Sequence, residues 1–162
     1  MVLRVDMCDI STVDVDAVVV GFYEDVRPLK GGAGALDWIL CGALSRLLLD
    51  DRIRGRLGEV ALLTSAGKMP AEKIFLLGMG PRAGQTPESL RAAARSAAAT
   101  VAGAGIRTAL IDCMPMGEGH NDQALAEVRA GILEGSAGRA LELTLLASDN
   151  ASLEHMTRIM QA

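Results

Sequence analysis

Short apolar runs with almost no polar interruption limit this chain to a few architectures. They lie at residues 2–5, 15–22, 60–64, 73–80, 107–114 and 141–147. Several of them, such as VDAVVVGF and KIFLLGMG, are apolar at successive positions, which is typical of strands covered on both faces. The segments between most of them have helical spacing. The sequence therefore predicts one α/β domain over residues 1–162, in which a mixed central sheet of about six strands lies between layers of helices.

Helical periodicity and capping residues predict four helices. The first is expected as one amphipathic helix from Ala33 to Leu49, with Trp38 filling volume on its apolar stripe or forming an interface. The second begins at Thr86 as N-cap, with Pro87 in the first turn and an alanine stripe facing the sheet. The third begins near residues 121–122 and carries Leu125, Val128, Ile132 and Leu133 inward, and the fourth follows residue 149. The expected order of strands and helices is β-β-α-β-β-α-β-α-β-α.

Charge and cysteine content exclude several classes of protein. The chain has 16 basic and 20 acidic residues, a formal net charge of −4, so nucleic acid is not an expected partner. Cys8, Cys41 and Cys113 are far apart and indicate neither a disulfide framework nor a metal knuckle. Only two histidines occur, so no metal site or cofactor is predicted. The amino terminus lacks a signal pattern and no apolar run approaches the ~20 residues that span a bilayer, which favours the cytoplasm over a membrane.

Three loops at predicted strand ends are the candidate sites, because ligands of open α/β sheets bind beyond the carboxyl ends of strands. They are CDIS at residues 8–11, the stretch PLKGGAGALDWILCG at residues 28–42, and MPMGEGH at residues 114–120. Each of the two glycine-rich loops has two interpretations. Its glycines can present backbone amides to a phosphate, or they can allow a turn and close backbone packing. Asp9 is likewise a ligand contact or a turn residue whose carboxylate accepts from nearby amides.

Four stretches carry a resemblance to macro domains. CDISTVDVDAVVVGF resembles the first loop and strand of that fold, and GGAGALDWILCGAL resembles its first glycine-rich loop and helix. IDCMPMGEGHNDQALAEV is similar to its second phosphate loop, and LELTLLASDNASLEHMTRIM to its last strand and helix. The resemblance spans nearly the whole chain and implies a macro-domain-like three-layer sandwich.

This resemblance implies a set of ligand contacts. Asp9 would accept from an adenine amino group, and Ile10 would offer its backbone. The ribose and phosphate side would meet Gly31, Gly32 and Gly34, and the diphosphate would meet Gly117, Glu118 and Gly119, beside His120. The expected asparagine segment is replaced by residues 20–23, VGFY, so hydrolysis of an ADP-ribosyl bond is not expected.

Electrostatics weigh against the diphosphate at the second loop. A carboxylate at Glu118 about 5 Å from a phosphate would cost roughly 3 kcal/mol at an effective dielectric of about 20. The favourable interaction of a negative charge with a helix N-terminus would offset only about 0.3 to 1 kcal/mol of this repulsion. Lys30 or a protonated His120 would offset this repulsion if either pointed at the ligand.

The middle of the chain also resembles the amino-terminal domain of leucyl aminopeptidases, which is itself macro-like. The stretches VVVGFYED, GGAGALDWIL and GRLGEVALLTSAGKMPAEKIFLLGMGPRAGQTPESLRAAARSAAATV carry this resemblance. In that family a separate carboxyl-terminal domain with two metal ions performs catalysis, and this chain ends before such a domain. The resemblance therefore implies no catalytic residue, no metal ligand and no peptidase activity.

The functional prediction is a non-catalytic binding or assembly module that forms a homo-oligomer or binds a protein partner. The alternative is a macro domain that binds ADP-ribose or a nucleotide. Its ligand would lie in the cleft between the Gly31–Gly34 loop and the Gly117–His120 loop.

Overall fold

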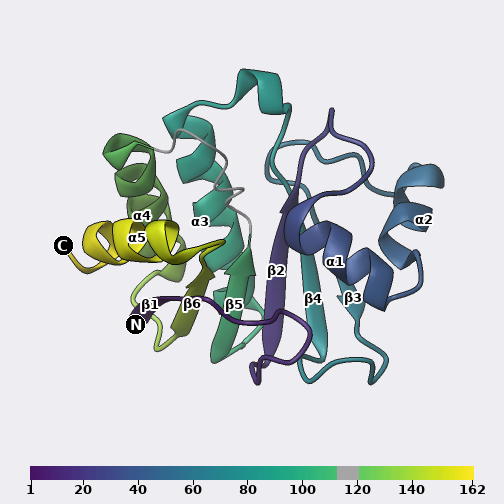
Figure 1. Cartoon of the computed structure of the whole chain (residues 1–162), viewed down its shortest axis with the longest axis horizontal. Helices are drawn as coiled ribbons and strands as arrows, with labels where there is room; N and C mark the ends of the chain where they lie inside the picture. The colour runs from purple at the N-terminus through teal and green to yellow at the C-terminus, as the bar shows by residue number, and fades with distance from the viewer. Residues whose placement is uncertain (113–120) are drawn as a thin grey trace.

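The computed structural model describes residues 1–112 and 121–162, which form one six-stranded sheet with helices on both faces (Figure 1). The strands are β1 (Val2–Asp6), β2 (Ala17–Phe22), β3 (Val60–Thr64), β4 (Lys73–Gly78), β5 (Thr108–Asp112) and β6 (Glu142–Leu146). The helices are α1 (Gly31–Ile39), α2 (Ala43–Leu49), α3 (Pro87–Gly103), α4 (Asp122–Ser136) and α5 (Asn150–Gln161), with a short 3-10 turn at Arg82–Gly84. The predicted α/β class is confirmed.

The sheet is mixed, with strand order β1-β6-β5-β2-β4-β3. Neighbouring strands are parallel throughout except at one edge, where β3 runs antiparallel to β4. The carboxyl ends of β2, β4 and β5 therefore meet at one rim of the sheet, and α1 begins near that rim (Figure 1). This is the rim at which the sequence predicted a ligand site.

The central strand β2 divides the core into its two layers. Ala17 and Val19 face the cluster that contains α3, α4 and α5, whereas Val18 and Val20 face the cluster that contains α1 and α2. All four side chains are buried. Because successive side chains of a strand point to opposite faces, an uninterrupted apolar run is what a strand covered on both faces requires. The predicted three-layer arrangement follows from this pattern.

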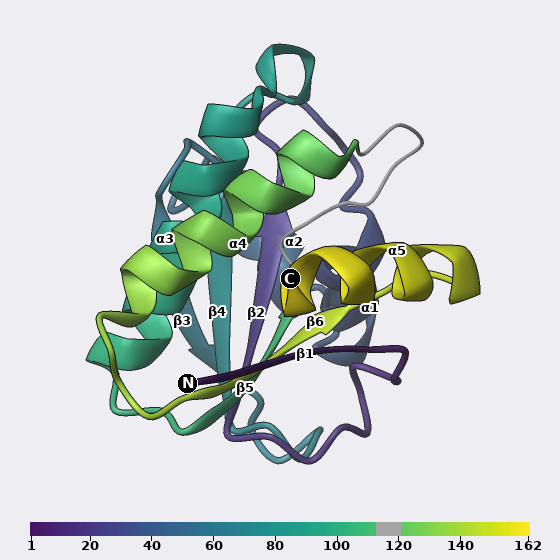
Figure 2. The same cartoon turned by 90° about the vertical axis from the view of Figure 1, so that its left-hand side faces the viewer.

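Helices α3 and α4 pack side by side along the same face of the sheet (Figure 2). The alanine stripe of α3 is buried as predicted. Two glycines of α4 lie against its backbone: a Cβ at Gly131 or at Gly135 would stand 2.3 Å from the carbonyl oxygen of Arg91 or of Arg95 respectively. Real Cβ atoms do not approach closer than 3.0 Å. These glycines therefore set the distance between the two helices.

The single helix predicted over residues 33–49 is wrong. The structure has two helices there, bent by 107°, and the break contains Cys41 at a φ of 55° and Gly42 at a φ of 80°. Two consecutive left-handed residues end a right-handed helix, because they reverse the backbone path. Trp38 is accordingly 88% exposed rather than packed, and Leu133, predicted to face inward, is 46% exposed.

The helix caps agree better with the sequence. The hydroxyl of Thr86 accepts from the backbone N–H of Ser89 at 3.1 Å, and Ser89 returns a bond, which closes a capping box. Asp149 caps α5 through the N–H of Ser152 at 2.7 Å. Among the described residues, no single helix is long and apolar enough to cross a membrane. Only α1 and α2 taken together have that length and apolar character, and they are bent relative to each other.

Candidate functional site

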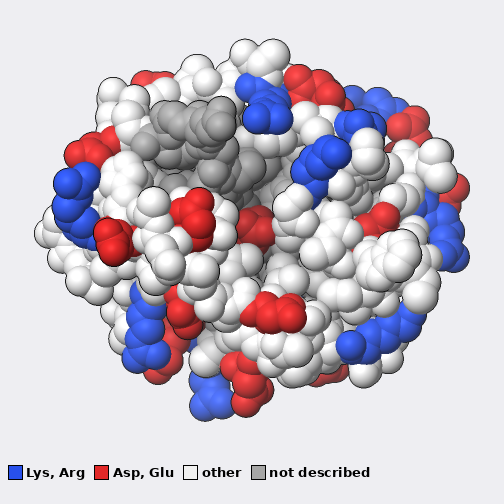
Figure 3. Space-filling model, in the orientation of Figure 1, with Lys and Arg blue, Asp and Glu red and all other residues white. Residues whose placement is uncertain are grey.

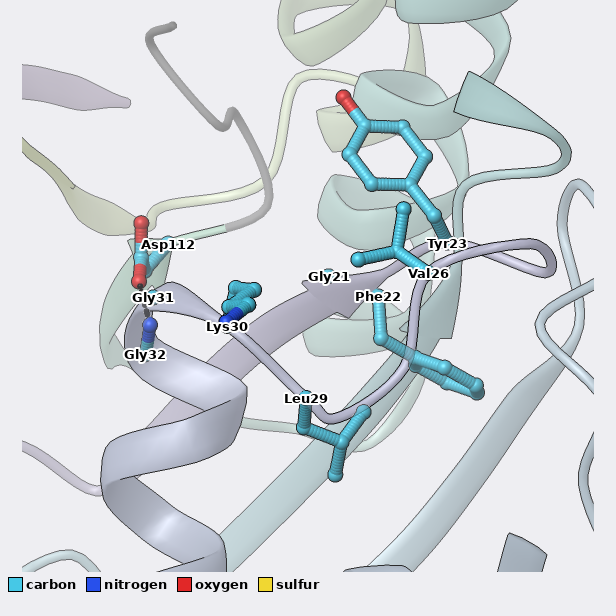
Figure 4. A pocket seen from close by; sticks show the side chains of 9 residues that line it. All are labelled: Gly21, Phe22, Tyr23, Val26, Leu29, Lys30, Gly31, Gly32 and Asp112. Carbon is cyan, nitrogen blue, oxygen red and sulfur yellow. Dashed lines mark hydrogen bonds between the residues drawn. The ribbon is translucent and has the colours of Figure 1, made fainter. Parts of the chain in front are cut away.

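A small cavity lies at the carboxyl rim, between the end of β2 and the start of α1 (Figure 4). Its volume is about 70 Å³, far below the ~300 Å³ at which pockets for drug-sized ligands begin. Its walls are mostly apolar, and its polar groups gather at the start of α1. The lining residues are Gly21, Phe22, Tyr23, Val26, Leu29, Lys30, Gly31, Gly32 and Asp112.

At the amino terminus of α1, one backbone amide is already bonded to a carboxylate of the protein. Asp112 ends β5, and its Oδ2 accepts the backbone N–H of Gly32 at 2.8 Å (Figure 4). Burial raises the pKa of the Asp112 carboxyl, and the hydrogen bond from Gly32 lowers it in part. An unpaired helix N-terminus attracts anions. Here the first turn is capped by an anion from the neighbouring strand.

Each glycine of the Gly31–Gly34 loop is explained by a different structural requirement. Gly31 has a φ of +58°, a backbone conformation that side chains disfavour. A Cβ on Gly32 would stand 2.1 Å from Oδ2 of Asp112, and a Cβ on Gly34 would stand 2.7 Å from the carbonyl oxygen of Leu29. Turn geometry, the carboxylate cap and close backbone packing thus account for the GGAG pattern, and ligand contact by these glycines stays a prediction.

The CDIS loop at residues 8–11 exposes Asp9 and buries Ile10. The Oδ1 of Asp9 accepts from the backbone N–H of Ser11 at 2.8 Å and from its hydroxyl at 2.6 Å, and these bonds lower the pKa of the exposed carboxyl. Asp9 thus serves as a turn residue, one of its two predicted interpretations. Ile10 is buried, with its Cδ1 3.2 Å from the Cβ position of Gly32. The structure brings Ile10 and Asp112 to Gly32.

Phe22 and Tyr23, which replace the expected asparagine segment, form part of the core. Both are buried, and they enter opposite core clusters. The Tyr23 hydroxyl accepts from Nε2 of Gln85 at 2.8 Å, and burial raises its pKa. Both side chains also line the small cavity at the carboxyl rim.

The remaining predicted contacts, Gly117, Glu118, Gly119 and His120, lie outside the described residues, as does Cys113. In the described part of the chain, no group of three or more His, Cys, Asp or Glu side chains could hold a metal ion. Acidic and basic side chains are interspersed over the face seen in Figure 3, which is hollowed near its centre.

Sequence reasoning missed Asp112 as a site residue. The available signal was a carboxylate directly after the apolar strand run ALI, at the rim where a helix N-terminus was expected. Its contact with Gly32 joins positions 80 residues apart, which spacing alone does not reveal.

Solved structures with the same fold are macrodomains and an aminopeptidase. The Oceanobacillus iheyensis macrodomain with ADP superposes with a TM-score of 0.75 at 16% identity, covering 98% of this chain and 90% of that one. The Trypanosoma brucei macrodomain in complex with ADP gives 0.70 at 19% identity, covering 97% and 67%. A tomato leucine aminopeptidase mutant gives 0.74 at 18% identity, covering 99% of this chain and 35% of that one. The fold is macrodomain-like.

The family follows from the sequence comparisons. The model described as "Cytosol aminopeptidase family, N-terminal domain" matches residues 19–149, and the chain belongs to this family. A Geobacter sulfurreducens protein named "Probable cytosol aminopeptidase" is 36% identical over 110 residues, which are 67% of this chain and 22% of that protein. One from Geobacter sp. is 41% identical over 78 residues, which are 48% and 16% of the two. The chain spans less than a quarter of the length of these relatives.

Proposed function

We propose that this chain is a protein-assembly module without peptidase activity of its own, built on the amino-terminal domain of the cytosol aminopeptidase family. The family match covers that domain. The names of the relatives support a cytoplasmic location as part of the same proposal.

One observation carries the assembly role. Of the nine large apolar side chains that are exposed in the described residues, five belong to the α1-to-β3 part of the chain. Trp38 is the most exposed at 88%, followed by Leu49 and Leu62 at 84% and 56%, with Leu57 and Val60 also exposed. Contiguous exposed apolar surface marks sites of protein contact, and Leu57, Val60 and Leu62 lie close together in the chain. Tryptophan is also enriched at the energetic centres of interfaces.

The alternative function is nucleotide or ADP-ribose binding at the α1 rim. It is favoured by the macrodomains of the same fold that contain ADP. Two features of this chain oppose it. The Asp112 carboxylate holds the Gly32 amide, and the described cavity measures only about 70 Å³. A diphosphate at this helix N-terminus would meet a negative charge of the protein, so assembly is the better-supported function.

Three assays on the purified chain test this proposal together. Sedimentation velocity over a range of concentrations measures self-association, an aminopeptidase assay with divalent metal ions measures catalysis, and a thermal-shift titration with ADP-ribose measures ligand binding. The proposal predicts association, no release of amino acids and no shift. A chain that stays monomeric at every concentration, that ADP-ribose stabilises, or that releases amino acids contradicts it.

A further inference from the structure

The edge strand β3 has backbone groups that point away from the sheet and have no hydrogen-bond partner among the described residues. In its ladder with β4, the carbonyl of Glu59 accepts from the N–H of Gly78 at 2.7 Å, and the N–H of Ser65 donates to the carbonyl of Glu72 at 2.9 Å. Backbone groups of an antiparallel strand alternate in direction along the chain. Residues 59, 61, 63 and 65 therefore bond β4, whereas the N–H and C=O groups of residues 60, 62 and 64 face outward from the sheet edge.

The side chains of these outward-facing residues are also exposed. Val60 and Leu62 lie on the same face as their β4 partners Leu77 and Phe75, which belong to the core cluster of α3. The intervening residues Ala61 and Leu63 pack toward the α1 and α2 layer instead. At β3 the α3 layer no longer covers the sheet, since β3 forms its outer edge (Figure 1). An apolar surface thus runs beside the unpaired backbone.

The two edges of the sheet differ in protection. The opposite edge, β1, carries Arg4 and Asp6, and Arg4 pairs with Glu142 of β6 at 4.0 Å. Charged side chains on an edge strand oppose pairing with another chain. The sequence of β3 is VALLT, with no charge, proline or glycine. The β3 edge therefore has none of these protective residues, although the sheet carries them at its other end.

We propose that a second copy of this chain pairs with β3 in antiparallel orientation, about a twofold axis that passes between the two Leu62 residues. This inference rests on the proposed assembly function and names its partner. Only the outward-facing residues 60, 62 and 64 can exchange hydrogen bonds across the new edge, and the register that pairs Leu62 with Leu62 uses all three of them. Leu62 then faces Leu62 of the second copy, and Val60 faces Thr64.

The strand is self-complementary in this register. Three pairs of residues exchange backbone bonds, and the two Leu62 side chains meet on one face of a continuous sheet. Because β3 contains no charged residue, its two copies would not place like charges opposite each other. The nearest acidic side chain, Glu59, accepts the backbone N–H groups of Arg54, Gly55 and Arg56 at 2.9, 2.7 and 3.2 Å, so its carboxylate is engaged within its own chain.

Substitution of the central residue tests the interface. Leu62→Lys places two ammonium groups against each other at the twofold axis and leaves the bonds to β4 untouched. Leu133→Lys is the matched control, since Leu133 is also an exposed leucine, at 46%, and lies on α4, outside the α1-to-β3 part of the chain. We expect sedimentation equilibrium to show a dimer weakened at least about tenfold, about 1.4 kcal/mol, by Leu62→Lys. The Leu133→Lys dimer should match the wild type.

Hydrogen exchange of the unaltered chain tests the register. At concentrations where the chain is dimeric, the amides of Val60, Leu62 and Thr64 should be protected, and dilution should release them. The amides of Ala61 and Leu63 should be protected at both concentrations, because they bond β4.

The outcomes separate this inference from the function on which it rests. A dimer that survives Leu62→Lys, or whose Leu62 amide exchanges freely, overturns the β3 interface and leaves the assembly role intact. A chain that stays monomeric at every concentration overturns both.

Discussion

Replacing Asp112 by asparagine isolates the charge that closes the α1 terminus. The Asp112 carboxylate accepts from the Gly32 amide at 2.8 Å, and the amide oxygen of an asparagine can accept the same bond. A phosphate bound at this helix N-terminus would lie about 5 Å from the carboxylate. At an effective dielectric of about 20, the repulsion is roughly 3 kcal/mol, which corresponds to roughly a hundredfold in affinity. The substitution removes this repulsion and keeps the cap.

Calorimetric titration with ADP at neutral pH measures the effect. We expect Asp112→Asn to bind ADP roughly a hundredfold more tightly than the wild type. Asp14→Asn is the matched control, because it removes one charge near the amino end of β2, beside the surface cavity at the opposite rim of the sheet. If the wild type binds ADP tightly and Asp112→Asn weakens it, Asp112 is a ligand contact and the reasoning is refuted.

Two further substitutions test the packing and the capping of the helices, and the pH dependence of Asp112→Asn tests the titration of its carboxyl. Gly135→Ala should lower the free energy of unfolding, measured in urea, by about 1 to 3 kcal/mol, because its Cβ would stand 2.3 Å from the Arg95 carbonyl oxygen. Gly103→Ala is the control and should not destabilise the fold, because the space around Gly103 is open. Equal free energies of unfolding for the two variants would contradict the packing. Thr86→Ala should cost about 1 kcal/mol in the same assay through loss of the capping box, and no loss would show that the cap contributes nothing. Burial raises the pKa of Asp112 in the folded state, so ionisation of this carboxyl opposes folding. The free energy of unfolding of Asp112→Asn relative to the wild type should therefore grow as pH rises through that pKa. A difference in unfolding free energy that stays constant from acid to neutral pH would contradict this sign.

The strands and the caps of α3 and α5 were predictable because their causes are local. An uninterrupted apolar run such as AVVV leaves both faces of a strand in need of cover, which the two core clusters around β2 provide. Thr86 and Pro87 define a helix start through their own backbone preferences. Such signals depend on a few adjacent residues.

The missed features depend on contacts between distant segments. The apolar spacing of residues 33–49 continues through the break, so only the left-handed backbone at Cys41 and Gly42 reveals two helices. The Asp112 carboxylate lies beside the Gly32 amide because β5 pairs with β2 in the sheet. The run VALLT predicted a strand, but its position at the sheet edge follows from the topology.

Sedimentation equilibrium of the wild-type chain, from low to high micromolar concentration at neutral pH, is the most direct test of the assembly role. We expect a concentration-dependent rise from the mass of one chain to twice that mass, unaffected by ADP-ribose. A constant mass of one chain throughout the range, with ADP-ribose bound stoichiometrically, would contradict it.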